Sequence, residues 1–288
     1  MTSLLEVLTR AEADKVAVGH FNFSDLATFN AIVAAAREKR LPLMLGVSEG
    51  EREFTGVRQA AALVKSVRDE YGHPIFLNAD HTHTIAKAEA AARAGFDEII
   101  FDGSALAFEE NIAQTKKAIE AIKSINPAIL VEGEIGWIGG ASAVLDRIPE
   151  GVGVLTTPEE AKQFVEATAV DILAPAVGNM HGMLASMVHG GVRKRLNIER
   201  IKEIKAAVRI FMTLHGGSGT DDDDFRRAIR SGMTIVHVNT EIRLAWRRGV
   251  EAALAAEPNE VAPYKVLGGA VEGVKEVVSS RLELFSSR

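Results

Sequence analysis

Eight apolar runs recur along the chain, and nearly every one ends in a polar residue. In order, the runs are VAVGHFN to Asn22, PLMLGVS to Ser48, PIFLNAD to His81, EIIFDGS through Asp102, AILVEGE to Glu134, DILAPAVGNMH to His181, RIFMTLH to His215 and TIVHVNT to Thr240. Read as parallel strands, they deliver these side chains to one rim. In a (β/α)8 barrel the catalytic groups sit at the carboxyl ends of the strands, so this rim is where function is expected.

Segments with helical spacing separate the apolar runs. They cover 24–39, 56–70, 84–94, 105–124, 158–168, 197–208, 220–231 and 240–256. The alternation of strand and helix indicates parallel βαβ units, and eight repeats favour a closed TIM barrel over an open sheet. Since 47% of the 288 residues are hydrophobic, we expect one domain over 1–288. The tail, 260–285, is predicted to form one more amphipathic helix.

Two stretches interrupt the rhythm of strand and helix. Residues 137–157 are rich in glycine, irregular, and follow the fifth run. We expect them to form a mobile loop over the active-site rim. Residues 182–196 follow the sixth run in the same way.

Composition excludes several classes of protein. The formal net charge is -6 and the basic residues are scattered, so nucleic acid is not an expected partner. The chain has no cysteine, so any metal must be held by nitrogen and oxygen. The first residues, MTSLLEVLTRAEADK, lack an apolar core of signal-peptide length, and no later run approaches a membrane span. The sequence therefore predicts a cytoplasmic protein without membrane contact.

Three histidines stand at the ends of the third, sixth and seventh runs: His81, His181 and His215. Three imidazole ligands that leave a position open for substrate are typical of a catalytic metal centre. Asp80 precedes His81 and is a candidate general acid, because a strand end often turns and brings both neighbours to the site. His83 is the less favoured ligand, since HxH pairs in metal-dependent hydrolase barrels usually follow the first strand.

Carboxylates end the fourth and fifth runs. Asp102 and Glu134 are expected either to hold a second metal position or to orient the ligand histidines. Glu132, in the same run as Glu134, is expected to have a supporting role.

A glycine-rich turn offers an anion site. Residues 215–219, HGGSG, allow backbone N–H groups to approach a phosphate closely, and barrels often bind phosphate after strands seven and eight. Gly182 and Thr240 add donors at the same rim. No lysine lies within the strand runs or at their ends, which disfavours Schiff-base chemistry. Carbanion chemistry stabilised by a Lewis-acidic metal fits better.

With these residues in view, the chain resembles the class II, metal-dependent ketose-bisphosphate aldolases over essentially its whole length. The matching stretches are GHFNFSDLATFNAIVAAA, LMLGVSEG, NADHTH, GFDEIIFDGS, VEGEIG, TTPEEAKQFVEATAVDILAPAVGNMHG, LHGGSG and VNTE. The resemblance implies cleavage of a ketose phosphate, most often fructose 1,6-bisphosphate, to dihydroxyacetone phosphate and an aldehyde through a metal-stabilised enediolate. Tagatose 1,6-bisphosphate or a deoxy-ketose phosphate is the alternative substrate.

The resemblance also assigns roles to individual residues. His81, His181 and His215 would ligate the metal, usually zinc, with cobalt, iron or manganese as substitutes. Asp80 would be the proton donor to the aldehyde oxygen, and Asp102 with Glu134 would match an alternative metal position. The substrate and its phosphate would be bound by Asn22, Ser48, Gly182, Gly217, Ser218, Asn239 and Thr240. A sodium or potassium ion near the phosphate and a homodimer or homotetramer are further implications.

Three departures from the family pattern stand out. Gly139-Gly140-Ala141-Ser142-Ala143 lacks the usual Glu-Asp pair that supplies a base, for which Asp146 or Glu150 is the hypothetical replacement. His237 stands where an asparagine normally contacts the triose, so it is expected to contact substrate, with a fourth metal-ligand role as the alternative. Glu257-Pro258-Asn259 replaces a common Asp-Pro-Arg, whose arginine binds the second phosphate. The candidate replacements for it are Lys265, Arg52 and Arg147.

Two other functions remain open at this point. A metal-dependent hydrolase on the same barrel would activate water and would need no phosphorylated ketose. A non-catalytic sugar-phosphate-binding homologue would keep the metal and anion sites without turnover.

Overall fold

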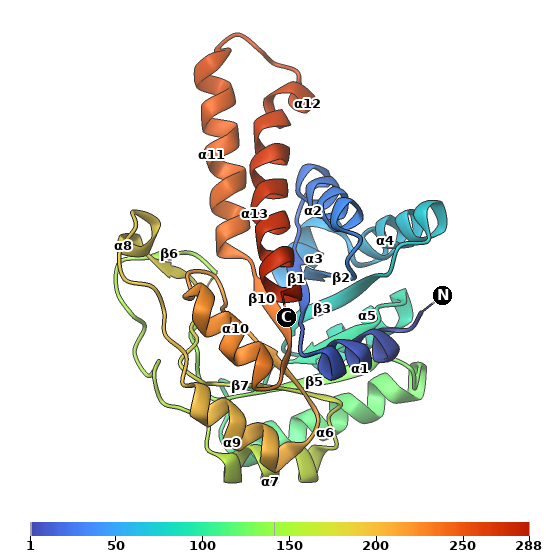
Figure 1. Cartoon of the computed structure of the whole chain (residues 1–288). Coiled ribbons are helices and arrows are strands. Elements are labelled where there is room, and N and C mark those ends of the chain that lie inside the picture. Colours follow the sequence, from blue (N-terminus) through green and yellow to red (C-terminus); the bar gives the residue numbers. More distant parts are fainter. Residues whose placement is uncertain (1, 141, 288) are drawn as a thin grey trace.

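The computed structural model describes residues 2–140 and 142–287, and across them eight parallel strands close into a barrel in the order β1-β10-β9-β7-β5-β4-β3-β2. The barrel strands are β1 (Val18–Asn22), β2 (Leu43–Val47), β3 (Ile75–Thr82), β4 (Glu98–Phe101), β5 (Leu130–Ile135), β7 (Ile172–Pro175), β9 (Phe211–Leu214) and β10 (Met233–Val238). The predicted TIM barrel is confirmed (Figure 1).

The helices between these strands lie where the apolar spacing places them. They are α2 (Leu26–Lys39), α4 (Val57–Tyr71), α5 (Ile85–Ala94), α6 (Phe108–Ile125), α7 (Pro158–Thr168), α9 (Ile198–Val208), α10 (Asp222–Arg230) and α11 (Thr240–Ala256). Local capping sets their starts: Thr157 and Glu160 form a capping box, and the side chain of Asp221 accepts from the N–H groups of Asp223 and Asp224. The main core lies between the strands and this ring of helices.

A helix that the periodic pattern did not predict covers the amino-terminal end of the barrel. This helix, α1 (Leu4–Asp14), begins at a capping box formed by Ser3 and Glu6. Its buried face packs with the first residues of the strands in a separate apolar cluster: Leu4, Val7, Leu8, Ala11, Val18, Met44, Phe76, Leu130, Ile172 and Ile235. The S-x-x-E spacing is the sequence signal for it. The rim at the carboxyl ends of the strands is thus left as the open end.

The C-terminal tail forms two helices, where one was predicted. A short helix, α12 (Pro263–Val266), precedes the long α13 (Gly268–Ser286). In Figure 1, α11 and α13 stand side by side and project away from the barrel, with α12 near the tip. The two long helices touch closely because both have glycine at the crossing: a Cβ on Gly249 would lie 2.4 Å from backbone atoms of Gly269.

The two irregular stretches are joined to each other. The stretch 137–157 contains β6 (Val144–Leu145), and the stretch 182–196 contains β8 (Met183–Leu184). These two short strands pair in parallel. β8 leads directly into the short α8 (Ala185–Val188). Another short helix, α3 (Glu49–Thr55), follows β2 at the rim. Of the altered motif at 139–143, Ala141 lies outside the described residues.

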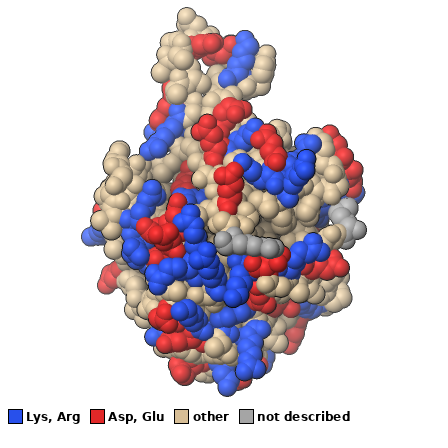
Figure 2. Space-filling view, in the orientation of Figure 1, with Lys and Arg blue, Asp and Glu red and all other residues tan. Residues whose placement is uncertain are grey.

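Charges of both signs are mixed over the face of the molecule in Figure 2. Within the described part of the chain, no helix combines the length and the apolarity that crossing a bilayer requires.

Candidate active site

A bulge at the end of β3 brings two neighbouring side chains to the site. The register with β4 shifts between Ala79 and Thr82, and His81 has a φ of 43°. A non-glycine residue rarely adopts this left-handed conformation, and such strain concentrates at functional sites. Because the backbone turns here, Asp80 and His81 both line the same cavity, although neighbours in a regular strand point to opposite faces.

Four side chains from four loops and strands converge on one point. His81, Glu134, His181 and His215 each offer a nitrogen or oxygen atom, and these atoms all lie within 4.8 Å of one another. Three of the atoms available there, His181 Nε2, His215 Nδ1 and Glu134 Oε2, are buried and have no hydrogen-bond partner among the described residues. Buried polar atoms are normally satisfied, so this convergence fits a divalent metal ion with mixed nitrogen and oxygen ligands.

Carboxylates outside this cluster orient two of the histidines. Asp102 accepts a hydrogen bond from His81 Nδ1 at 2.8 Å, and Glu132 accepts one from His215 Nε2 at 2.7 Å. With Nε2 engaged, His215 presents Nδ1 to the cluster. Asp102 thus lies outside the cluster and is hydrogen-bonded to one of its histidines, whereas Glu134 belongs to the cluster itself.

The buried ionisable groups of the cluster shift one another's pKa values. Burial opposes the charged form of His81, but Asp80, Asp102 and Glu134 hold its pKa well above the ordinary value. Burial, together with His81 and His215, lowers the pKa of His181 well below its ordinary value, which leaves a neutral imidazole. Burial and Asp102 raise the pKa of Glu134 to about 8. Protons and a metal ion would therefore compete for the carboxylate of Glu134 and the imidazoles of the cluster.

A second group of ligand-capable side chains does not form a metal site. His20, Asp80 and His237 also place donor atoms within 4.8 Å of one another. However, the rings of His20 and His237 are stacked face to face, with centroids 3.4 Å apart and an interplanar angle of 2°. An imidazole binds metal in its own plane, and two parallel planes do not meet at one ion. His237 also stacks on His215, at 4.2 Å, so the predicted alternative of a fourth metal ligand is not supported.

Asp80 has one oxygen free to act on a ligand. Its Oδ2 accepts from the amide of Asn22 at 2.8 Å, whereas its buried Oδ1 has no hydrogen-bond partner and lies 3.6 Å from His237 Nδ1. Burial raises its pKa, but the positive charge on His81 and other histidines more than offsets this and keeps it below its ordinary value. The second N–H of Asn22 donates to Glu51, so Asn22 holds Asp80 in place.

Glycine-rich turns after β7 and β9 meet at the predicted anion site. Gly216 has a φ of 60°, and a Cβ there would lie 2.4 Å from the carbonyl oxygen of Met180, so the two turns need glycine to pack. The N–H groups of Gly182 and Ser218 have no acceptor among the described residues. The N–H of Gly217 donates to the carbonyl of His237 at 3.0 Å, so Gly217 provides room for the turn and its N–H is not available to an anion.

These residues surround a cavity of about 460 Å³ with a small annex of about 20 Å³. The annex is lined by residues of the anion site and of the start of α11, among others: Asn22, Gly182, Gly216, Ser218, His237, Asn239 and Thr240. The larger part is lined by Ser48, Glu49, His83, Asp102, Trp137 and Arg243, among others. His83 is on this wall, but it is not in the metal cluster.

The hypothetical replacements for missing family residues do not reach this cavity. Asp146 and Glu150 are exposed and are not on its wall, so the structure does not support either as the base. Arg52 is 4% exposed and donates to the carbonyls of Val47 and Asp80. Arg147 is also absent from the wall. Lys265 belongs to α12, the short helix near the tip in Figure 1, and its Nζ pairs with Glu260 at 2.7 Å.

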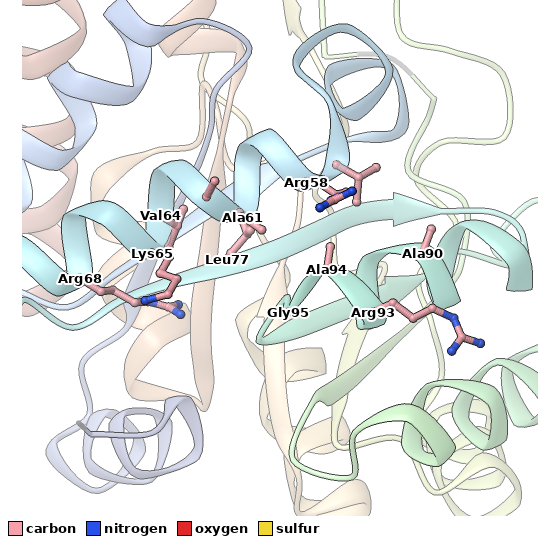
Figure 3. A pocket seen from close by; sticks show the side chains of 12 residues that line it. Arg58, Ala61, Val64, Lys65, Arg68, Leu77, Ala90, Arg93, Ala94 and Gly95 are labelled. Atoms are coloured by element: carbon pink, nitrogen blue, oxygen red, sulfur yellow. The ribbon is translucent and has the colours of Figure 1, made fainter.

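A larger hollow, of about 650 Å³, lies on the outside of the barrel between α4 and α5 (Figure 3). Its wall combines small apolar residues with basic ones, and it has neither a histidine nor a carboxylate. It therefore lacks the groups that the chemistry of the rim would need.

Sequence reasoning missed several residues of the site. Arg243 lies three residues after Thr240, one helical turn into α11, and this spacing is the signal that could have found it. His20 and Lys194 are buried, at 0% and 5% exposure, through contacts with distant segments. No local pattern marks them.

Comparison with known proteins gives one consistent result. The sequence model of the family described as "Fructose-bisphosphate aldolase class-II" matches residues 2–288. A protein of Bacillus subtilis named "Probable fructose-bisphosphate aldolase" is 35% identical over 290 residues, covering 100% of this chain and 98% of its own. The fructose-bisphosphate aldolase of Geobacillus stearothermophilus is 33% identical, with coverage of 100% and 97%. The crystal structure of the YdjI aldolase from Escherichia coli K12 superposes with a TM-score of 0.82 at 26% identity, covering 99% of this chain and 97% of that one.

Proposed function

The chain belongs to the class II fructose-bisphosphate aldolase family, and from that premise we propose that it cleaves a ketose phosphate, with fructose 1,6-bisphosphate as the first candidate, into dihydroxyacetone phosphate and an aldehyde. The observation that carries this proposal is the convergence of His81, Glu134, His181 and His215 beside the unpartnered oxygen of Asp80. A metal site and a proton-transfer group then face one cavity.

His81, His181 and His215 would hold the divalent metal, with Glu134 beside them. Zinc is the proposed ion, and cobalt, iron or manganese would suit the same donor set. When bound, such an ion supplies Lewis-acid stabilisation of the negative charge that develops on the ketose carbonyl oxygen. Glu132 and Asp102 keep the ligand histidines in the required orientation.

Asp80 is the proposed proton-transfer group. In the cleavage direction its free Oδ1 takes the proton of the C4 hydroxyl, the C3–C4 bond breaks and the C4 carbonyl forms. The electron pair of the broken bond remains on the three-carbon fragment as the enediolate. In the condensation direction the same proton returns to the aldehyde oxygen. Asn22 fixes the other oxygen of the carboxylate, which leaves Oδ1 for this transfer.

The annex is the proposed site for the phosphate of dihydroxyacetone phosphate. The free N–H groups of Gly182 and Ser218 and the start of α11 at Thr240 would be its donors, because a helix N-terminus favours an anion. Asn239 and His237 would contact the triose from the same wall.

Two groups of the family mechanism, the loop base and the arginine that binds the second phosphate, are replaced in this chain, so other residues would have to take their roles. The described loop residues on the cavity wall, Trp137, Gly139, Gly140, Ser142 and Ala143, include no acid or base. The proton that the enediolate carbon takes up would therefore come from elsewhere on the rim. For the second anionic group of a bisphosphate, we propose Arg243, which lines the cavity with its side chain 48% exposed.

A second ketose phosphate, such as tagatose 1,6-bisphosphate or a deoxy-ketose phosphate, is favoured by one observation. His237 lines the annex, and its ring stacks on the buried ring of His20. An imidazole there offers a different hydrogen-bond pattern from an amide, and discrimination between epimers depends on such single contacts.

The decisive experiment is retro-aldol turnover on metal-stripped protein, before and after addition of zinc, with coupled detection of dihydroxyacetone phosphate. Fructose 1,6-bisphosphate, tagatose 1,6-bisphosphate and ketose 1-phosphates would be compared. Zinc-restored turnover of any of them supports the aldolase. Tight sugar-phosphate binding without turnover of the panel would identify a binding protein instead, and activity on unphosphorylated substrates would identify a hydrolase.

A homodimer or homotetramer in the cytoplasm completes the proposal. The projecting tip carries exposed apolar residues, of which Val261 is 87% and Tyr264 78% exposed, and an interface there would cover them. Light scattering that gave only the 30.9 kDa monomer would contradict the assembly. The proposed location derives from the sequence alone, and cell fractionation tests it.

A further inference from the structure

Lys194 has an unusual environment for a lysine. It follows α8, is only 5% exposed, and its Nζ donates to three backbone carbonyl oxygens. These belong to Met180 at 2.7 Å, Gly182 at 2.6 Å and Gly216 at 2.9 Å. The ammonium therefore lies in a cage of carbonyl oxygens and has no carboxylate among its hydrogen-bond partners.

The cage selects the charged form of the side chain. Burial lowers the pKa of Lys194 to about 7, and the carboxylate of Glu241 opposes this shift. Three carbonyl acceptors, however, require three N–H donors, which only the protonated amine possesses. A neutral amine or an apolar side chain would leave at least one buried carbonyl without a partner.

The cage is built from the same turns that face the anion site. Gly182 and Gly216 both line the annex, and so does Ser218. The backbone of Lys194 joins the second turn as well, because its N–H donates to the carbonyl of Gly219 at 2.9 Å and its carbonyl accepts from Asp221 at 3.2 Å. The ammonium thus donates to the carbonyls of two glycines, Gly182 and Gly216, that also line the annex.

We propose that Lys194 is a built-in monovalent cation of the phosphate site. Rings of backbone carbonyl oxygens are the usual protein ligands of dissolved alkali ions, and here an ammonium attached to the chain takes that position. It offsets the repulsion between three converging carbonyl dipoles and adds a fixed positive charge behind the anion. Lys194 then occupies the position that the expected sodium or potassium ion would take. Phosphate binding should therefore not require an alkali salt.

Lys194 is a positioning residue in this scheme, since it acts through the turns that it joins. The inference rests on the proposed function only in taking a phosphate group as the anion. Binding of inorganic phosphate therefore tests it independently of turnover.

The experiment is a calorimetric titration of the zinc-loaded protein with inorganic phosphate. It is repeated at constant ionic strength in tetramethylammonium, sodium, potassium and ammonium chloride. We expect wild-type affinity to be the same in all four salts. Lys194→Ala should bind phosphate about tenfold more weakly in tetramethylammonium chloride and recover most of this loss in potassium or ammonium chloride, because a small cation fits the vacated cage. Lys194→Met, which fills the cage without charge, should stay weak in every salt.

Arg193→Ala is the matched control, since Arg193 is the exposed neighbouring cation and should leave affinity unchanged. Circular dichroism and zinc content per chain show whether each variant is folded. Wild-type phosphate affinity that rises with potassium or sodium overturns the proposal even if no variant folds. Lys194→Ala that binds phosphate as tightly as the wild type in tetramethylammonium chloride also overturns it. Failure to cleave any ketose phosphate, with these binding results as expected, would contradict the proposed function and leave Lys194 in its role.

Discussion

The Nε2–H of His215 donates to Oε1 of Glu132 across 2.7 Å in the barrel interior, where both side chains are fully buried. This one contact decides which nitrogen of His215 meets the metal cluster, because it commits Nε2 and leaves Nδ1 without a protein partner. A residue that touches no substrate therefore sets the geometry of a proposed ligand.

Replacing that carboxylate should weaken metal binding. For Glu132→Gln we expect about 10-fold to 100-fold lower zinc affinity, since removal of a group that orients a metal ligand typically has this effect. Competition with a chromophoric chelator measures it. An unchanged zinc affinity would mean that Glu132 does not orient His215.

Glu98, which interacts with Glu132 in the barrel interior, gives a prediction of its own about pH. Burial and the nearby Glu132 raise its pKa well above the ordinary value of a glutamate. A carboxyl whose folded-state pKa is raised contributes stability that is fully present below the unfolded value and lost as the pH rises through the folded value. Glu98→Gln should therefore flatten the fall in thermal stability as the pH rises above the ordinary carboxyl pKa. Melting temperatures measured from about pH 4.5 upward, at equal zinc content, would show this, and a slope equal to that of the wild type would contradict it.

Asp80→Asn should lower kcat strongly without loss of ligand binding. General acid–base catalysis contributes about 10² to 10⁴-fold, so kcat should fall by that order. Zinc content and phosphate affinity should stay near the wild-type values, because Asp80 is neither one of the proposed metal ligands nor one of the proposed phosphate donors. A variant that kept its kcat would exclude Asp80 as the proton-transfer group.

Arg243→Met should discriminate between bisphosphates and monophosphates. We expect KM for fructose 1,6-bisphosphate to rise about tenfold and KM for fructose 1-phosphate to change little, since only the former has the second anionic group. Arg247→Met, one turn further along α11 and absent from the cavity wall, is the matched control. Equal increases for both substrates would show that Arg243 acts by holding the loop, through its hydrogen bond to the carbonyl of Ser142.

The loop carboxylates provide the last test. Asp146→Asn combined with Glu150→Gln should leave kcat within about twofold of the wild type, because surface substitutions away from the site have small effects. Stopped-assay comparison of the purified double variant suffices. A large loss of kcat would return one of these residues to the role of base and would require the loop to adopt another conformation over the cavity.

The sequence predicted the barrel and the ends of its strands because both follow from local periodicity. His81 and His215 stand at or beside strand ends, as their positions after apolar runs indicate. The convergence of His181 was harder to place, since β7 ends at Pro175 and six further residues carry the chain to the site. Its neighbouring glycines, rather than a strand, bring it there.

Contacts between distant segments were not predictable in the same way. The stacking of His20 on His237 joins the first strand to the last, and Lys194 meets carbonyls on two other turns. No sequence pattern in the surrounding segment marks any of these residues. The failure of Arg52 as a phosphate ligand has the same origin, because its burial depends on β2 and β3 packing around it.

The length of α11 has a mechanical consequence. The helix starts at Thr240 on the wall of the annex and continues for 17 residues to the projecting tip, a span of about 25 Å. A helix behaves as a nearly rigid rod along its axis. A second subunit bound at the tip would therefore also restrict the motion of Thr240, the proposed phosphate donor at the other end of the helix. Assembly and phosphate binding would then be thermodynamically linked, each strengthening the other by the same factor.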